Sequence, residues 1–132
     1  MKELFGFSNE IISIGVDIEN ISRFQGLTVE KDTSFLTRLF TEKELDYCFS
    51  RGNPEQHLAA RYAGKEAIIK AFSTKGRASL NYGEIEILND DTGAPRAAIL
   101  KKGFDNLHIL LSLSHSQELA IAFTVVSLRV EK

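Results

Sequence analysis

The sequence predicts an α+β fold in which helices pack on one face of a mostly antiparallel sheet. Three observations support this: a β-branched apolar run at residues 11–18, helical patterns within residues 35–72, and short strand patterns from residue 84 onwards. A chain of 132 residues, 43% of them hydrophobic, can bury a core of its own. We expect residues 11–132 to form a single domain, preceded by an extension of residues 1–10.

Caps and breakers delimit the helices. Apolar residues recur at helical spacing over residues 35–40. Thr41 is followed three residues later by Glu44, a capping-box pattern that predicts the start of another helix. Pro54 suits a first helical turn, and the Ala-rich segment after it predicts a helix over residues 54–72. Apolar and polar alternation then predicts four strands, at residues 84–87, 97–100, 108–113 and 118–126.

Composition excludes several classes of protein. The chain has 18 acidic and 16 basic residues, a net charge of −2, which argues against a general nucleic-acid binder. The one cysteine, Cys48, cannot form an internal disulfide, so we expect a reducing cytoplasm. No apolar run approaches the roughly 20 residues that span a bilayer, and the N-terminus lacks a signal-peptide core.

Two basic residues of the long predicted helix lie where apolar residues are expected. At about 100° per residue, Lys65 falls within a stripe of large apolar residues and Arg61 falls beside it. Lys65 either extends its amine into water or meets an anion, and these two readings have similar weight. A second stripe, of small residues, would allow another element to approach closely: Ala60, Gly64, Ala67 and Ala71.

Glu66 and Lys70 lie at the margin of the large stripe. They form an i,i+4 pair, which as a purely structural feature contributes about 0.2–0.5 kcal/mol. Residues 61–77, however, include five basic residues and one acidic residue, the local charge that a phosphate-bearing ligand needs. A solvated basic face is the simpler alternative.

Asp17 interrupts the apolar run near the N-terminus. It either caps the following helical turn or, together with Glu66, binds a hard divalent cation, because Mg²⁺ takes one or two protein carboxylates and completes its shell with water and phosphate oxygens. His115, flanked by serines at a strand end, is a candidate proton shuttle or phosphate ligand, with a hydrogen-bonded turn residue as the alternative. His57 and His108 have no such setting. A serine hydrolase lacks support because there is no Gly-x-Ser-x-Gly motif.

Four segments together resemble the 4′-phosphopantetheinyl transferases of the short holo-acyl-carrier-protein synthase type. The matching segments run in order over most of the chain: residues 15–23, 40–45, 60–72 and 112–116. Gly64 stands where the family commonly has alanine. Residues 73–77 replace a Gly-rich loop of the family, which leaves open how the coenzyme A 3′-phosphate is bound.

The resemblance implies a role for each matching residue. Asp17 and Glu66 match carboxylates that bind Mg²⁺, with Mn²⁺ as an alternative. The residues implied in catalysis are Glu66, Lys65 and His115. Those implied in coenzyme A binding are Arg61, Lys65, Lys70 and His115; Ser73 and Lys75, in the segment that departs from the family, can also bind phosphate. Arg23 and Arg38 match basic positions that meet an acidic helix of an acyl carrier protein.

The function implied is Mg²⁺-dependent transfer of the 4′-phosphopantetheine group from coenzyme A to a serine of apo acyl carrier protein, with release of adenosine 3′,5′-bisphosphate. The resemblance further implies a cytoplasmic homotrimer with sites shared between subunits, and neither nucleic acid nor membrane as partner. The acceptor could serve fatty acid biosynthesis or a specialised pathway. The alternative is a non-catalytic α+β module that binds a nucleotide or an acidic partner through the basic patch of residues 61–77.

Overall fold

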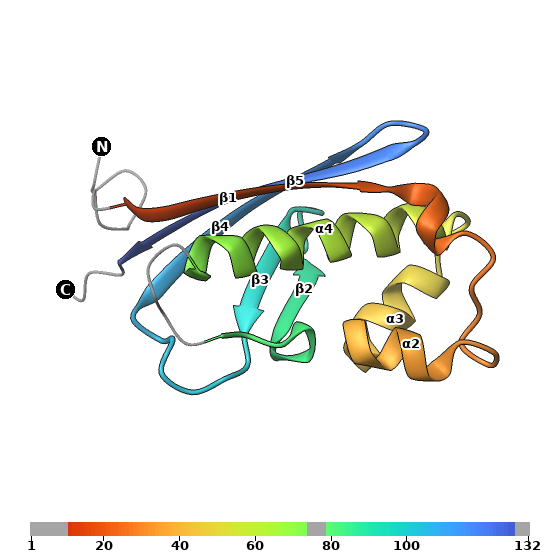
Figure 1. Cartoon of the computed structure of the whole chain (residues 1–132), viewed down its shortest axis with the longest axis horizontal. Coiled ribbons are helices and arrows are strands. Elements are labelled where there is room, and N and C mark those ends of the chain that lie inside the picture. The colour runs from red at the N-terminus through yellow and green to blue at the C-terminus, as the bar shows by residue number, and fades with distance from the viewer. Residues whose placement is uncertain (1–10, 74–78, 129–132) are drawn as a thin grey trace.

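A long helix, α4, packs against both sheets of the molecule (Figure 1). The computed structural model describes residues 11–73 and 79–128. The helical elements are η1 (Ile21–Phe24), α2 (Thr33–Leu39), α3 (Glu42–Phe49), α4 (Pro54–Ser73) and η2 (Tyr82–Glu84). The strands are β1 (Ile11–Asn20), β2 (Ile85–Asn89), β3 (Pro95–Ile99), β4 (Leu107–His115) and β5 (Leu119–Leu128).

The strands form two antiparallel sheets. One has three strands in the order β1-β5-β4, and the other is the hairpin β2-β3. In the larger sheet Asp17 lies opposite Ala122 and His115 lies opposite Ala120. The predicted α+β class and antiparallel pairing are confirmed, whereas the sequence predicted one sheet and the structure divides the strands between two.

The helix starts follow the predicted caps. Thr41 Oγ1 accepts a hydrogen bond from the Glu44 backbone N–H at 3.3 Å, and Glu44 Oε1 accepts one from the Thr41 N–H at 2.8 Å. This reciprocal capping box begins α3. Pro54 begins α4, where its missing N–H costs nothing.

The small-residue stripe of α4 brings strand and helix backbones into close contact. A Cβ added at Gly15 of β1 would lie 1.9 Å from the Ala67 carbonyl oxygen, so only glycine fits there. Ala67 and Ala71 have no exposed surface, and a Cβ at Gly64 would lie 2.7 Å from Ile87 Cδ1 of β2. The close approach expected from the sequence is therefore confirmed.

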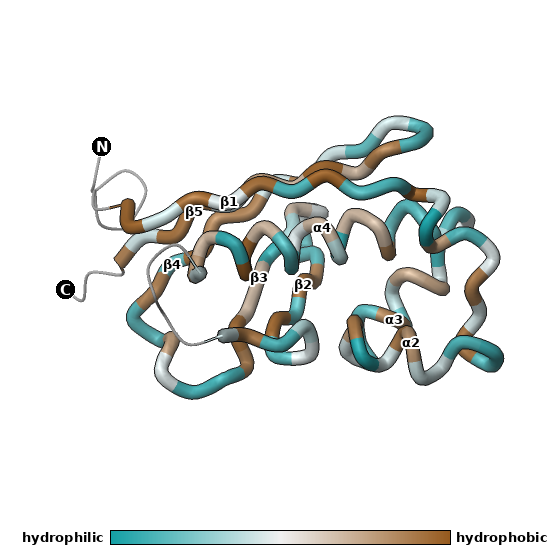
Figure 2. Tube along the Cα trace, viewed as in Figure 1, coloured by the Kyte–Doolittle hydropathy of each residue, from teal (hydrophilic) through white to brown (hydrophobic). Residues whose placement is uncertain are grey.

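The face of the larger sheet that points away from α4 is apolar. Alternate residues of β1 and β5 point outward and are 42–58% exposed, and we call them the outer sheet face: Ile14, Val16, Ile18, Ile121 and Phe123. Figure 2 shows that hydrophobic positions recur along β1 and β5. Such a contiguous patch is typical of an interaction surface.

Two predictions concern the limits of the described chain. The expected N-terminal extension, residues 1–10, lies outside the described residues. Within the described residues, no helix combines the length and hydropathy needed to cross a membrane.

Candidate functional site

Asp17 lies in the middle of β1, on the sheet face that α4 covers. Its Oδ1 accepts a hydrogen bond of 2.8 Å from Lys70 Nζ, which also donates to the Val16 carbonyl at 3.2 Å. The Lys70 side chain is 55% exposed, so this ion pair lies at the surface. Asp17 does not cap the following turn, because Asn20 occupies the N-cap of η1.

Glu66 lies one turn before Lys70 on α4 and is half-buried. Its Oε1 accepts a hydrogen bond from the Tyr82 hydroxyl of η2. The Tyr82 ring stacks on Tyr62 with ring centres 5.5 Å apart. Burial, followed by the hydrogen bond to Glu66, raises the pKa of Tyr82, so its hydroxyl remains a donor at neutral pH.

Asp17 and Glu66 both act on the Lys70 ammonium group. The hydrogen bond to Asp17 and the charges of Asp17 and Glu66 raise the pKa of Lys70, despite partial desolvation. The two carboxylates, far apart in the sequence, thus lie around one exposed cation. We call Asp17, Glu66, Lys70 and Tyr82 the carboxylate cluster.

The chemistry of this cluster fits a hard divalent cation. Within the described residues, Asp17 Oδ2 and Glu66 Oε2 accept no hydrogen bond, which leaves one oxygen of each carboxylate for a ligand. No three His, Cys, Asp or Glu side chains gather in that part of the chain. A two-carboxylate set suits Mg²⁺, which keeps water and phosphate oxygens in its shell.

Lys65 is buried, so its amine does not extend into water; the anion that it meets is a carboxylate of this chain, Glu44. Its side chain has no exposed area, and Nζ donates to Glu44 Oε1 at 2.6 Å, to the Leu39 carbonyl at 2.8 Å and to the Tyr82 carbonyl at 2.9 Å. An ammonium group has three hydrogens, so all its donors are used inside the fold. Burial lowers the pKa of Lys65, and Glu44 opposes this effect. In this arrangement Lys65 Nζ has no hydrogen left to donate to a phosphate.

Arg61 is buried too, one turn before Lys65 on α4. Its Nε donates to the Ile87 carbonyl at 3.1 Å, its Nη2 donates to Asn89 Oδ1 at 3.0 Å, and its guanidinium lies 4.3 Å from the centre of the Tyr47 ring. Only 2% of Arg61 is exposed. Its guanidinium therefore anchors β2 to α4, and the predicted direct contact with coenzyme A does not follow from its position.

His115 is exposed at the end of β4, with Nδ1 3.3 Å from the Ser116 carbonyl oxygen. Burial, then the charges of Arg61, Arg51 and His115, lower the pKa of His57. The His57 ring also meets the Tyr47 ring edge-on at 5.6 Å. We call His57, His115, Tyr47, Arg61 and Asn89 the histidine cluster.

The two clusters do not meet within one chain. Arg61 and Glu66 are five residues apart on α4, or about 140° around the helix axis. Asp17 and His115 lie on the two edge strands of the sheet, on either side of β5, where their partners Ala122 and Ala120 are two residues apart. One copy therefore presents two separate parts of the predicted site.

The remaining predicted residues lie as follows. Ser73 ends α4 and donates from Oγ to the Ile69 carbonyl at 2.8 Å. Lys75 lies outside the described residues. Arg23 of η1 is 47% exposed, pairs with Glu19 at 3.1 Å and lies 4.8 Å from the centre of the Tyr62 ring. Arg38 is exposed in the last turn of α2.

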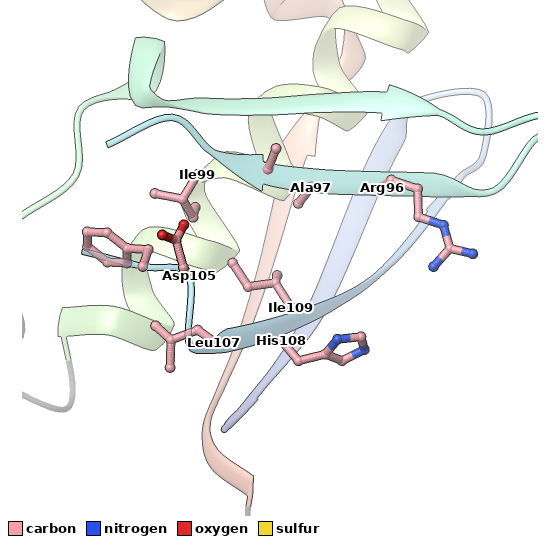
Figure 3. A pocket seen from close by; sticks show the side chains of 9 residues that line it. Arg96, Ala97, Ile99, Asp105, Leu107, His108 and Ile109 are labelled. Carbon is pink, nitrogen blue, oxygen red and sulfur yellow. The ribbon is translucent and has the colours of Figure 1, made fainter. Parts of the chain in front are cut away.

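A pocket of about 510 Å³ lies between β3 and β4, away from both clusters (Figure 3). Arg96, Ile99, Asp105 and His108 are among its lining residues. Because β4 is the sheet edge opposite β1, this pocket does not adjoin Asp17. Nothing in its lining connects it to the predicted chemistry.

The chain matches a family and several solved structures over most of its length. Residues 13–124 match the model of the 4′-phosphopantetheinyl transferase superfamily. The holo-[acyl-carrier-protein] synthase of Geotalea daltonii is 40% identical over 122 residues, covering 88% of this chain and 98% of its own.

Two crystal structures show the same fold. The holo-[acyl-carrier-protein] synthase of Neisseria meningitidis superposes with a TM-score of 0.75 at 31% identity, covering 89% of this chain and 98% of its own. The enzyme of Bacillus anthracis, solved in complex with CoA (3′,5′-ADP), superposes with a TM-score of 0.70 at 27% identity, covering 89% and 97%.

Proposed function

Because this chain belongs to the 4′-phosphopantetheinyl transferase superfamily, we propose that it transfers phosphopantetheine from coenzyme A to an acyl carrier protein in a Mg²⁺-dependent reaction. The carboxylate cluster carries this proposal. Asp17 pairs with the exposed Lys70, and Glu66, one turn before Lys70 on α4, also acts on its charge, so we place the pyrophosphate beside these three side chains. The structure of the Bacillus anthracis relative, named with CoA and 3′,5′-ADP, supports the substrate and the released bisphosphate.

The residues of the carboxylate cluster have different roles in binding the metal and the pyrophosphate. Asp17 and Glu66 would hold Mg²⁺ or Mn²⁺, which supplies Lewis-acid polarisation of the phosphoryl oxygen when bound. When coenzyme A binds, Lys70 leaves its ion pair with Asp17 and pairs with the pyrophosphate instead. There its positive charge offsets the negative charge that develops on the leaving group. Ser73, one turn further along α4, extends this binding surface.

The reaction exchanges one phosphorus–oxygen bond for another. The serine oxygen of the carrier protein attacks the β-phosphorus, and the bond between that phosphorus and the bridging oxygen breaks to release adenosine 3′,5′-bisphosphate. The serine proton goes to a base, for which Glu66 and His115 are the two candidates. Lys65 and Arg61 act indirectly, by positioning Tyr82 and β2.

We further propose that the two clusters combine between copies in a homotrimer. If three copies bury their outer sheet faces against one another, the β1 edge of one copy comes beside the β4 edge of the next. Asp17 of one copy then approaches His115 of a neighbouring copy. This arrangement explains why the outer sheet face is apolar and why one copy holds only separate parts of the site.

Acyl carrier protein would dock through Arg23 and Arg38. Arg23 is exposed and stacks on Tyr62, which lies one helical turn before Glu66. An acidic helix bound there would bring its serine close to the carboxylate cluster. We place the protein in the cytoplasm, which suits the free thiol of the buried Cys48.

Mass spectrometry of apo acyl carrier protein tests the function. The carrier is incubated with this protein, coenzyme A and Mg²⁺, and we expect it to gain the mass of one phosphopantetheine group. The gain disappears in EDTA, and Glu66→Ala abolishes it while circular dichroism remains native. A well-folded Glu66→Ala protein with wild-type turnover would contradict the metal assignment. Coenzyme A binding without transfer to any of several carriers would instead favour the binding module.

A further inference from the structure

Tyr82 connects the interior of the protein to the carboxylate cluster. Its hydroxyl donates to Glu66 Oε1, while its backbone carbonyl accepts from the buried Lys65 ammonium at 2.9 Å. It lies in the three-residue helix η2. A short element of this kind has few internal hydrogen bonds, so outside contacts must fix its position.

The buried partner of Lys65 is itself held from three sides. Glu44 Oε1 accepts from the Thr41 N–H and from Lys65 Nζ, and Glu44 Oε2 accepts from the Ile87 N–H at 2.8 Å. Neither Glu44 nor Lys65 has any exposed surface. Lys65 therefore offers the Tyr82 carbonyl a donor that is fixed in place by α3 and β2.

The other side of Tyr82 is equally constrained. Its ring stacks on Tyr62, and the two hydroxyl oxygens are 3.5 Å apart. With the backbone held by Lys65 and the ring held by Tyr62, the hydroxyl has one direction in which to point. That direction is toward Glu66.

We propose that Tyr82 is a positioning residue for Glu66: it holds Oε1 so that Oε2 faces the metal and pyrophosphate. This inference rests on the proposed function. Lys70 lies one turn away and attracts the Glu66 carboxylate. Without the Tyr82 hydroxyl, Glu66 is therefore free to turn toward Lys70, which lowers the fraction of molecules with both carboxylates ready for a cation.

The role of Lys65 follows from the same geometry. The lysine that the sequence places next to Glu66 acts on it through Tyr82, and a ligand need not touch Lys65. The path runs from Glu44 to Lys65, then through the Tyr82 backbone and ring to Glu66, with a hydrogen bond at each polar step.

Metal-dependent binding of coenzyme A tests the proposal without reference to turnover. The dissociation constant of coenzyme A is measured by calorimetry in Mg²⁺ and in EDTA. The dissociation constant in EDTA divided by that in Mg²⁺ reports the contribution of the metal to binding. We expect Tyr82→Phe to reduce this ratio about tenfold, the usual lower bound for loss of a hydrogen bond to a metal ligand. Binding in EDTA and the melting temperature stay as in the wild type, because the stacked ring is kept.

Two further variants sharpen the measurement. Tyr62→Phe also removes a tyrosine hydroxyl, but one that lies beside the Tyr82 hydroxyl instead of Glu66. We expect it to change the ratio less than threefold. In a Glu66→Gln background, Tyr82→Phe is expected to change nothing further, since the carboxylate it positions is gone.

The possible failures are distinguishable. A wild-type ratio of one would overturn the metal assignment in the proposed function, and this inference with it. A wild-type ratio well above one that Tyr82→Phe leaves unchanged overturns the inference alone. Equal weakening of binding in Mg²⁺ and in EDTA also overturns it, because that result indicates general structural damage.

Discussion

Lys65 and Glu44 are opposite charges buried without any exposed surface, 2.6 Å apart. Removing two charges from water costs several kcal/mol per ion, so such a pair persists only when additional hydrogen bonds satisfy both partners. Both partners meet this condition. Three acceptors surround the ammonium group, and three donors surround the carboxylate.

Breaking this pair from one side is expected to be costly. Glu44→Gln leaves the Lys65 charge buried and without a counter-charge, which we expect to destabilise the protein by about 3–5 kcal/mol. Thermal unfolding should show a fall in Tm of roughly 10 °C or more.

Glu42→Gln, in the exposed first turn of the same helix, is the matched control and should change the free energy of unfolding by less than about 0.5 kcal/mol. The double variant Glu44→Gln/Lys65→Met should recover part of the loss, because it removes both charges. Equal Tm values for Glu44→Gln and Glu42→Gln would show that the pair contributes nothing.

At the scale of single residues, sequence reasoning found the groups that interrupt a pattern. Asp17 is an acid in an apolar strand, and His115 lies between serines at a strand end. It placed Lys65 on the apolar side of its helix but did not identify Glu44 as its partner, because a helical wheel does not show which buried acid lies opposite. It missed Tyr82, because a tyrosine in a loop breaks no pattern and acquires its role only when η2 packs against α4.

Among the elements, the contact between β1 and α4 sets the position of Asp17. At Gly15 the strand backbone lies against the Ala67 carbonyl, two residues from Asp17 along the strand and one residue from Glu66 along the helix. The absence of a side chain at this point lets both carboxylates approach the same lysine. A larger residue would separate the strand from the helix and therefore the two acids.

Gly15→Ala is expected to disturb both fold and site. The new methyl group would lie 1.9 Å from a backbone oxygen that cannot move alone. We expect a loss of at least about 3 kcal/mol, at the upper end for overpacking, as measured by urea denaturation. Gly52→Ala serves as the control, because a Cβ there has nothing within 4 Å, and it should leave stability unchanged or raise it by about 0.4–1 kcal/mol. Unaltered unfolding of Gly15→Ala would contradict the close contact.

Most elements could be predicted from local signals, and their partners could not. The capping box at Thr41, the start of α4 at Pro54 and the four later strands are all in place. Alternation identifies a strand but does not say which strand pairs with it. The separation of β2 and β3 into their own sheet results from packing against α4, and no pattern in the sequence records it.

On the scale of the whole molecule, the outer sheet face and the divided site have one explanation. The five side chains of that face point away from the core of the single chain, and three of them exceed 50% exposure. An isolated protomer would leave this apolar surface in water. The proposed trimer would cover this surface and bring the two clusters together.

Phe123→Asp tests this assembly. Phe123 lies on the central strand of the sheet and is 44% exposed. Each copy would lose about 1.5–3 kcal/mol of apolar burial. We expect analytical ultracentrifugation to show a monomer at concentrations where the wild type is a trimer, with loss of transfer activity.

Ala98→Asp places the same charge on an exposed strand position of the other sheet and should leave the sedimentation coefficient unchanged. Wild-type sedimentation of Phe123→Asp would contradict assembly through the outer sheet face.

The outer sheet face also has a consequence in time. The rate at which one chain folds does not depend on protein concentration. The proposed assembly, which would cover its apolar sheet face, requires copies to meet, and the rate of these encounters rises with concentration. A newly made chain therefore passes through a period in which Ile14, Val16 and Phe123 are exposed and can contact other proteins. A low concentration of the protein lengthens this period. The risk of non-specific association with other proteins is therefore greatest when the protein is least abundant.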